Sequence, residues 1–485
     1  MPAVSTRNGT TAKAVATHGW IDTETVETRL GDYEFKGGYP TDDAAAKLAE
    51  QLVYNRAVEV YLSQMPVVSL YHVWKGTADA GTGAPNQLVI WETLMDAHTL
   101  LLTGNTETVY GLCSIDLKRD GPVVIVVPPK MLGGVTSLWQ GEVLGIGPTG
   151  ADKGQGARFL ILPPGYEGKP PQTYIIARSP TYRVLFGVRG FQVDGTTEAA
   201  VALMKGASVY PLAKAANPGA MTFVNGGGQP IDTLFPDTDQ YFDDLATIVE
   251  SEPASNFSPL DRFQIASIGI EKEKKFSPNA ERSKLLYDAA RFASAVARAN
   301  SFDNTDPERL VYPDRRWEWA FIGGSATWDS QGYVNTDRRA AFAYLAIGMS
   351  PAMVDKVVGQ GSQQYLTVYR DKDGAHLDGG KRYQLHLPAN IPVKNFWSVV
   401  VYDVRSRSLL ENGQPFPSVS TYTGPEVNAD GSVDIHFGPN EPTGGAKNWI
   451  ETVPGVGWFP LLRVYGPLQP YFDNTWKPDD IVEVK

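Results

Sequence analysis

An amide, a carboxylate and a phenol lie close together in the segment Asn105-Thr-Glu-Thr-Val-Tyr110. Side chains of an extended chain alternate between two faces, so Asn105 and Glu107 share one face and Tyr110 points to the other. A bend would let all three converge. Buried there, Glu107 could act as a general acid or base, while Tyr110 and Asn105 orient a polar substrate atom. We predict these three residues as catalytic; the alternative is a turn in which Asn105 and Glu107 cap backbone groups.

Arg189 is a charged residue inside the apolar segment LFGVRGFQVDG. A buried arginine needs a partner, because an unpaired charge is costly to remove from water. Glu107 or Asp194 could supply a structural ion pair, or Arg189 could hold an anionic group of a substrate. Arg463, in LLRVYG, presents the same alternatives near the end of the chain.

Several tryptophans could line an apolar ligand cleft, although a single tryptophan is more often part of a core. The candidates are Trp317, Trp319, Trp328, Trp397 and Trp449. Of these we predict Trp317, Trp319 and Trp397 as substrate-binding residues, together with Arg189.

Several familiar cofactor and catalytic motifs are absent or out of context. Residues 145–150 (GIGPTG) match GxGxxG, but Pro148 follows the second glycine and the next element is a predicted strand, which indicates a hairpin loop. The chain has no Walker loop and no GxSxG elbow, and its single cysteine, Cys113, lies inside a predicted strand. We predict no cofactor and no metal. A metal held by dispersed ligands, such as His386 and His436, stays an alternative.

The overall charge limits the class of partner. The 485 residues include 43 basic and 54 acidic side chains, a net charge of −11, which argues against nucleic acid as a partner. No secretory signal begins the sequence and no apolar run is long enough to span a membrane. We expect a cytoplasmic protein that associates with copies of itself, with a trimmed secreted form as the alternative.

The elements that must position these residues fall into four stretches. We expect a mobile N-terminal segment over residues 1–40. Residues 41–210 hold a helix that begins at Thr41 and a first β-rich unit, in which short apolar runs alternate with Gly/Pro clusters. Residues 211–350 form a helical insert, and residues 351–485 a second β-rich unit. The fold class is mixed α and β, dominated by two jelly-roll-like β-sandwich units.

Within the helical stretches, the apolar spacing predicts which faces are buried. Leu48 and Leu52 lie on a predicted core-facing stripe of the first helix, and Phe292 lies on one in the insert. The two β units also share an order of strand, proline, connector, tryptophan and strand. This indicates related units, although such an order can arise without duplication.

The motifs together resemble those of bacterial proteins that pair a domain of unknown function 1254 with a domain of unknown function 1214. The N-terminal resemblance lies in NTETVYG, ARFLILPPGY and FGVRGFQVDG, and the C-terminal one in RYQLHLPANIPVKNFWSVVVYD and LLRVYGPLQPYFDNTWKPDDIV. It covers most residues from about 40 to 485 and implies two jelly-roll-like units with helices between them. The family pattern has aspartate and leucine where this chain has Glu107 and Val109. The family's biochemistry is largely unassigned.

We therefore expect a soluble enzyme that performs hydrolysis or acid–base chemistry on a small apolar or aromatic molecule. Its cleft would lie between the first β unit and the helical insert, with Glu107 as the proton-transfer group. The alternatives are a non-catalytic ligand-binding or self-assembling jelly-roll protein, and a metal-dependent enzyme with dispersed ligands.

Overall fold

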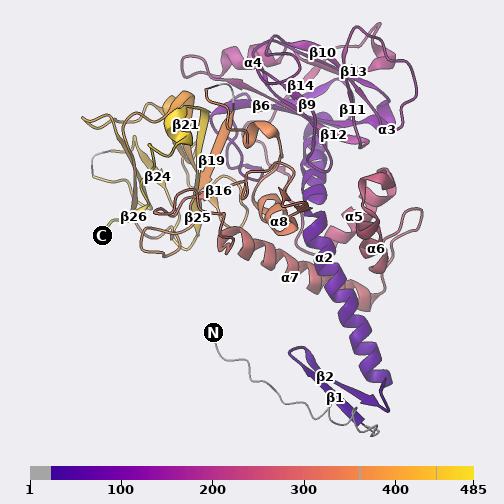
Figure 1. Cartoon of the computed structure of the whole chain (residues 1–485). Coiled ribbons are helices and arrows are strands. Elements are labelled where there is room, and N and C mark those ends of the chain that lie inside the picture. Colours follow the sequence, from indigo (N-terminus) through magenta and orange to yellow (C-terminus); the bar gives the residue numbers. More distant parts are fainter. Residues whose placement is uncertain (1–22, 360–361, 444) are drawn as a thin grey trace.

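The computed structural model describes residues 23–359, 362–443 and 445–485. Figure 1 shows two β-rich units side by side, with the long helix α2 (Asp42–Thr77) running from the first unit down past the other helices. The prediction of a β-dominated chain with helices between two β-rich units is confirmed, while jelly-roll topology stays a prediction. No helix within these ranges is both long and apolar enough to cross a membrane.

The first β unit consists of two facing sheets. The larger has the strand order β14-β4-β6-β12-β8-β9 and the smaller the order β11-β10-β7-β13. The larger sheet contains β14 (Thr222–Asn225), β4 (Gln87–Ile90), β6 (Thr108–Asp116), β12 (Arg183–Phe191), β8 (Leu132–Ser137) and β9 (Glu142–Ile146). The smaller contains β11 (Ile175–Arg178), β10 (Ala157–Leu162), β7 (Val123–Val127) and β13 (Ser208–Pro211). Two short helices belong to this unit, α3 (Leu117–Asp120) and α4 (Glu198–Met204).

The second β unit also consists of two sheets, with the strand orders β16-β19-β25-β21-β22 and β24-β23-β20-β26. The first of these contains β16 (Glu318–Trp319), β19 (Gln363–Thr367), β25 (Trp458–Pro467), β21 (Val393–Asp403) and β22 (Ser418–Ser420). The second contains β24 (Trp449–Glu451), β23 (Val433–Gly438), β20 (Tyr383–Leu387) and β26 (Val482–Glu483). The short helix α9 (Gln469–Phe472) follows β25.

The alternation of side chains along the central strands separates a shared core from the core of each β unit, and a fourth, small cluster lies on the smaller sheet of the first unit. On β12, Val184 and Phe186 face the core between the two sheets of the first unit, whereas Leu185 faces the helices. On β25, Leu462 belongs to the core of the second unit, whereas Leu461 again faces the helices. Both large sheets therefore turn their second face toward one shared core, and this places the alternate residues of β6, β12, β19 and β25 opposite one another.

The helices that form this shared core come mostly from the insert. They are α5 (Gln240–Ser251), α6 (Pro259–Ser267), α7 (Ala280–Phe302) and α8 (Thr336–Leu345), and they pack against α2. Two pairs of very short strands, β15 (Ile231–Asp232) with β5 (Thr99–Leu100) and β17 (Asp329–Ser330) with β18 (Tyr333–Val334), lie in the connections.

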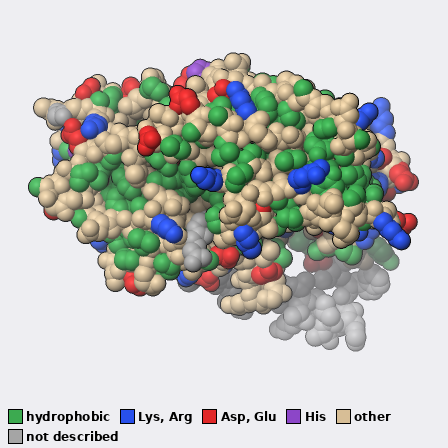
Figure 2. Space-filling view, turned by 90° about the horizontal axis from the view of Figure 1, so that it is seen from above, with side chains coloured by type: hydrophobic (Ala, Val, Ile, Leu, Met, Phe, Trp, Pro, Cys, Tyr) green, Lys and Arg blue, Asp and Glu red, His purple; other side chains and the backbone are tan. Residues whose placement is uncertain are grey.

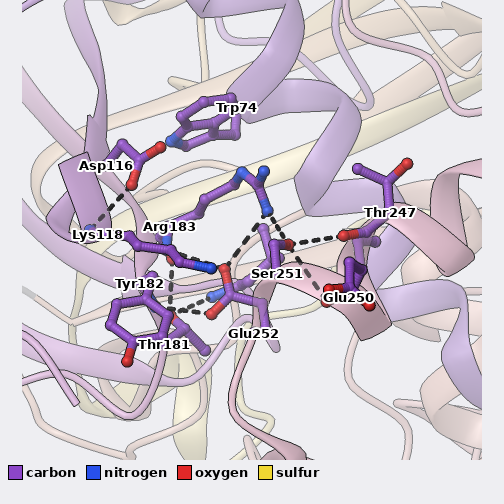
Figure 3. A network of polar contacts seen from close by, with 12 residues as sticks. Trp74, Asp116, Lys118, Thr181, Tyr182, Arg183, Thr247, Glu250, Ser251 and Glu252 are labelled. Atoms are coloured by element: carbon purple, nitrogen blue, oxygen red, sulfur yellow. Dashed lines mark hydrogen bonds and ion pairs between the residues drawn. The ribbon is translucent and has the colours of Figure 1, made fainter. Parts of the chain in front are cut away.

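A network of polar contacts joins the end of α5 to the start of β12 (Figure 3). Glu252 is fully buried, and its carboxylate accepts hydrogen bonds from the backbone N–H groups of Tyr182 (2.7 Å) and Arg183 (3.1 Å). Arg183 donates to the Ser251 hydroxyl, and its guanidinium carbon lies 5.3 Å from the Trp74 ring centre. Burial raises the pKa of Glu252, although the two N–H groups and Arg183 oppose that effect. The network holds α5 and α2 against the sheet that carries Arg189.

The N-terminal region differs from the sequence prediction. Residues 23–40 were expected to be mobile, but they form a three-stranded antiparallel sheet of β1 (Thr23–Thr28), β2 (Gly31–Lys36) and β3 (Tyr39–Pro40). Strand β1 consists mostly of threonine and glutamate and carries little apolar signal, whereas β2 alternates charged residues with Tyr33 and Phe35, a strand pattern that the sequence prediction missed. Residues 1–22, the rest of that prediction, lie outside the described residues.

Three apolar residues predicted to be buried are exposed instead. Leu48 and Leu52 lie on the N-terminal half of α2, which extends beyond the other helices in Figure 1, and Leu52 is 56% exposed. Phe292 on α7 is 52% exposed and contacts Tyr54, with ring centres 6.1 Å apart. The helical spacing was right, but this end of α2 has too few neighbours to cover a full stripe. On the face shown in Figure 2, acidic and basic side chains are dispersed among apolar ones.

Candidate functional site

Two cross-strand pairs of arginine and tyrosine occupy the helix-facing side of the two large sheets. Tyr110 on β6 lies directly opposite Arg189 on β12, and Tyr365 on β19 lies directly opposite Arg463 on β25. Each pair lies on the same face as apolar residues of the shared core, because side chains two apart along a strand point the same way. The fold therefore brings one Arg–Tyr pair from each β unit to the place where the units meet.

Hydrogen bonds connect these residues across the junction. Arg189 Nη1 donates to the Tyr110 hydroxyl at 3.2 Å. Asn105, which precedes β6, donates from Nδ2 to the hydroxyl of Tyr465 on β25 at 2.6 Å. Tyr365 donates its own proton to the side-chain oxygen of Gln363 on the same strand. The result is a polar cluster, defined here as Asn105, Tyr110, Arg189, Gln363, Tyr365, Arg463 and Tyr465.

Arg463 anchors this cluster. Its side chain is 4% exposed and donates to the Tyr402 hydroxyl (2.5 Å) and to the backbone oxygens of Thr103 (2.7 Å) and Gly104 (3.3 Å). Tyr402 in turn donates to the oxygen of Gly104 at 2.6 Å. Through these bonds, the second β unit fixes the loop that carries Asn105.

A cavity of about 360 Å³ opens beside the polar cluster. Every member of the cluster lines it, at one end. The remainder of its wall is mainly apolar and includes Leu70, Leu102, Leu185, Phe321, Phe342 and Met349. The cavity therefore offers hydrogen-bonding and charged groups at one end and an apolar surface over the rest, as small-molecule sites usually do.

The connection after α8 forms one wall of the cavity. The Gly348 N–H donates to Gln140 Oε1 at 2.8 Å, and Gln140 Nε2 donates to the oxygen of Pro66 inside α2 at 2.9 Å. The Ser350 hydroxyl donates to Glu142 Oε2 at 2.9 Å. These contacts fasten the wall to the first β unit and to α2, so the cavity is bounded by both units and by the insert.

Burial keeps the polar cluster in defined protonation states. It raises the pKa of the Tyr365 and Tyr465 phenols, so both stay protonated at neutral pH. Burial also lowers the pKa of Arg189, but Tyr110, Tyr365 and Tyr465 outweigh it and the net pKa is raised. The cluster therefore presents a permanent positive charge beside neutral phenols.

Neither arginine of the cluster has an acidic partner within the described ranges. No carboxylate oxygen lies within ion-pair distance of Arg189 or Arg463 there. The expected structural ion pair of Arg189 with Glu107 or Asp194 is therefore wrong. Asp194 lies in the exposed turn after β12, and the side chain of Arg189 meets the Tyr110 phenol instead.

Two family models match the chain around this site. The model described as Protein of unknown function (DUF1254) covers residues 85–211, and that described as Protein of unknown function (DUF1214) covers residues 362–469. The chain carries a DUF1254 domain followed by a DUF1214 domain. The resemblance read from the sequence is confirmed, and the cavity lies between the two domains.

Two solved structures are similar to the chain. The VPA0106 protein from Vibrio parahaemolyticus is 19% identical, with a TM-score of 0.56 over 89% of this chain and 100% of that one. An uncharacterized protein from Burkholderia cenocepacia is 11% identical, with a TM-score of 0.41 over 91% and 96% of the two chains. No curated protein matches the chain. The first similarity supports the fold alone.

The structure brings together two of the three residues predicted as catalytic. Asn105 and Tyr110 line the cavity, whereas Glu107 is buried, at 1% exposure, without lining it. Asn105 Oδ1 accepts from the Glu107 N–H at 2.7 Å, and the Glu107 carboxylate accepts from the Thr106 hydroxyl at 2.8 Å. The turn is therefore one in which Asn105 caps a backbone group, and its amide nitrogen still reaches Tyr465.

None of the three tryptophans predicted to bind substrate lines this cavity, although Trp319 lines a neighbouring pocket of about 220 Å³ that shares Phe321 and Tyr365 with it. Trp317 and Trp397 belong to the core of the DUF1214 unit, and Trp319 on β16 packs against that core. Of the predicted binding residues, Arg189 lines the cavity. The sequence reasoning missed Tyr365 and Tyr465; the spacing of Arg463 and Tyr465, two residues apart on one strand, was a usable signal.

The described residues bring no group of three His, Cys, Asp or Glu side chains into a metal-binding arrangement. His386 on β20 pairs with Asp434 on β23, with Nδ1 and Oδ1 2.7 Å apart, rather than with His436. His436 lies opposite Gln384. Binding of a metal by dispersed ligands therefore gains no support from these two histidines.

A second pocket, of about 390 Å³, lies at the DUF1214 unit where α7 ends. Its wall includes Glu318, whose carboxylate pairs with Arg309 Nε at 3.2 Å. Burial raises the pKa of Glu318 to about 7, although Arg309 opposes this. Arg370 likewise pairs with Asp303 at 2.9 Å, so Arg309 and Arg370 have acidic partners, unlike the two arginines of the polar cluster.

Proposed function

We propose that this chain binds a small organic molecule in the cavity between its DUF1254 and DUF1214 domains. The observation that carries the proposal is the division of one 360 Å³ cavity into an apolar part and a cluster of hydrogen-bond donors. Ligand sites typically span about 300 to 1,000 Å³, and a cavity of about 150 Å³ already holds benzene. The volume here fits one aromatic ring, or a short alkyl chain, together with a polar group.

The same arrangement favours an enzymatic role as the second candidate. Arg189, Tyr110 and Asn105 are donors that converge on one end of the cavity, where they would polarise a substrate carbonyl and stabilise negative charge on its oxygen. Hydrolysis at a carbonyl carbon and removal of a proton from the carbon next to a carbonyl both develop such a charge. Glu107 does not line the cavity, so in this proposal it supports the turn of Asn105, and the three donors stabilise the charge that develops on the substrate.

The test is a thermal-shift screen with two series of compounds of similar size. One series is aromatic and starts from 3-phenylpropanol, and the other is aliphatic and starts from octanol. A ligand at a hundred times its Kd adds about 2.7 kcal/mol to stability, which raises Tm measurably. The variant Ala346→Phe narrows the cavity at its wall and is expected to abolish the shift. Ala45→Phe, at an exposed position of α2, is the matched control.

If a ligand raised the Tm of the Ala346→Phe variant as much as that of wild type, it would bind outside this cavity, and the proposal would be contradicted.

Enzymatic action is tested by following bound compounds by mass spectrometry, with Tyr110→Phe and Glu107→Gln as variants. Product formation that Tyr110→Phe abolishes supports the enzyme, whereas binding without turnover supports the non-catalytic role.

We also propose that the protein is cytoplasmic and that it associates with copies of itself. Cell fractionation would test the location, and light scattering would test the self-association.

A further inference from the structure

The polar end of the cavity has more donors than acceptors. Tyr110 accepts a hydrogen bond from Arg189, and Tyr465 accepts one from Asn105. Each phenol therefore keeps its own O–H proton, and no side chain or carbonyl in the described part of the chain accepts either proton. Arg189 also interacts with the Tyr365 phenol, so the two hydroxyl protons and the guanidinium N–H groups not used by Tyr110 and Tyr365 are left for an occupant of the cavity.

The charges around the cluster also sum to an excess of positive charge. Arg189 and Arg463 each contribute one positive charge. Glu107 is a buried carboxylate nearby that is coupled electrostatically to Tyr402 and Tyr422. Two arginines against one buried acidic residue leave one formal positive charge uncompensated, and uncompensated charge in a poorly solvated region is costly.

Two further acidic side chains line the cavity but do not neutralise this excess. Glu142 and Asp355 are both exposed, so water and salt screen their charges. Glu142 also accepts the hydrogen bond from Ser350 at the wall. The excess positive charge therefore acts on the interior of the cavity.

We infer that the polar end binds the carboxylate of a small organic monoanion, whose apolar body occupies the leucine- and phenylalanine-lined part. This inference rests on the proposed function. A carboxylate has two oxygens that only accept hydrogen bonds, and it therefore matches Arg189 and the two phenol protons. A single negative charge balances the single excess positive charge, whereas the doubly charged form of a phosphate monoester would exceed it.

The experiment compares isosteric pairs by isothermal titration calorimetry: 3-phenylpropionate with 3-phenylpropanamide, and octanoate with octanamide. We expect each carboxylate to bind wild-type protein at least tenfold more tightly than its amide. Phenyl phosphate is titrated alongside, and we expect it to bind more weakly than 3-phenylpropionate.

The variant Arg189→Gln is expected to remove the preference for carboxylate, by at least a tenfold loss for the acids and little change for the amides. Arg178→Gln, at an exposed position of β11, is the matched control and should keep the preference. The wild-type comparison tests the inference even where Arg189→Gln fails to fold.

Equal binding of acids and amides to wild-type protein would overturn the inference and leave the proposed function standing. Tighter binding of phenyl phosphate than of the carboxylates would overturn it as well. Binding of neither series would count against both the inference and the proposed function.

Discussion

Replacement of Glu318 by glutamine should remove a dependence of folding stability on pH. Glu318 lies at the start of β16, and its side chain is 15% exposed. Burial raises its pKa from 4.5 to about 7 and outweighs the opposing attraction of Arg309. Asp303 adds to the rise and Arg370 opposes it, so the balance between burial and the two arginines decides the sign.

The magnitude follows from linkage between proton binding and folding. Between pH 4.5 and about 7, the folded protein holds a proton on Glu318 that the unfolded chain has released. The free energy of unfolding therefore falls as pH rises through this window, and it is unaffected by this group below it. A tenfold change in proton affinity corresponds to about 1.4 kcal/mol, so the full effect is about 3 kcal/mol.

The assay is urea denaturation of wild-type protein and Glu318→Gln at intervals from pH 4.5 to pH 8. The glutamine variant should gain about 3 kcal/mol relative to wild type over this range, because it has no charge to bury. Glu50→Gln, at an exposed position of α2, serves as the control and should track wild type. A variant that loses stability relative to wild type as pH rises would show that the ion pair with Arg309 outweighs burial, and would refute the reasoning.

Three further predictions concern other parts of the fold. Arg463→Met should lower the free energy of unfolding by about 2 to 4 kcal/mol in urea, because Tyr402 and two backbone oxygens lose a charged donor; a loss below about 1 kcal/mol would contradict this. Burial raises the pKa of the Cys113 thiol to about 12, so it should resist Ellman's reagent at pH 8 until the protein unfolds, and rapid labelling of native protein would be inconsistent. Ser258→Ala should cost about 1 kcal/mol in thermal unfolding, since the hydroxyl caps α6 through the N–H of Asp261; an unchanged Tm would argue against it.

Much of the local structure could be read from the sequence. A helix beginning at Thr41 and a helical insert over residues 211–350 were expected from the sequence. Helix α6 carried an unread signal in the capping box of Ser258 and Asp261, with proline at the first helical position. Asn105, Tyr110 and Arg189 were predicted as site residues from their side-chain types and their positions in predicted strands, and all three line the cavity. Local periodicity was enough for these, because it depends on residues a few positions apart.

The composition of the cavity could not be read in the same way. Tyr365 and Tyr465 come from strands more than 250 residues after Tyr110, and no short-range pattern indicates that their sheet faces that of the DUF1254 unit. The same limit explains Leu52 and Phe292: a helical stripe shows which side chains share a face, but not whether a neighbour covers it. Trp317 and Trp397 were predicted to line a cleft because the sequence does not show which residues pack around them. In the structure both belong to a core.

The amino-acid sequence by itself determined the order of the two domains, the strand alternation that directs Arg189 and Arg463 out of their own cores, and the acidic net charge. Only the tertiary structure decided that these two arginines meet at one cavity, that phenols rather than carboxylates surround them, and that Glu107 lies outside its wall. The reason is physical: backbone alternation sets the direction of a side chain, whereas its neighbours are set by how whole sheets and helices pack.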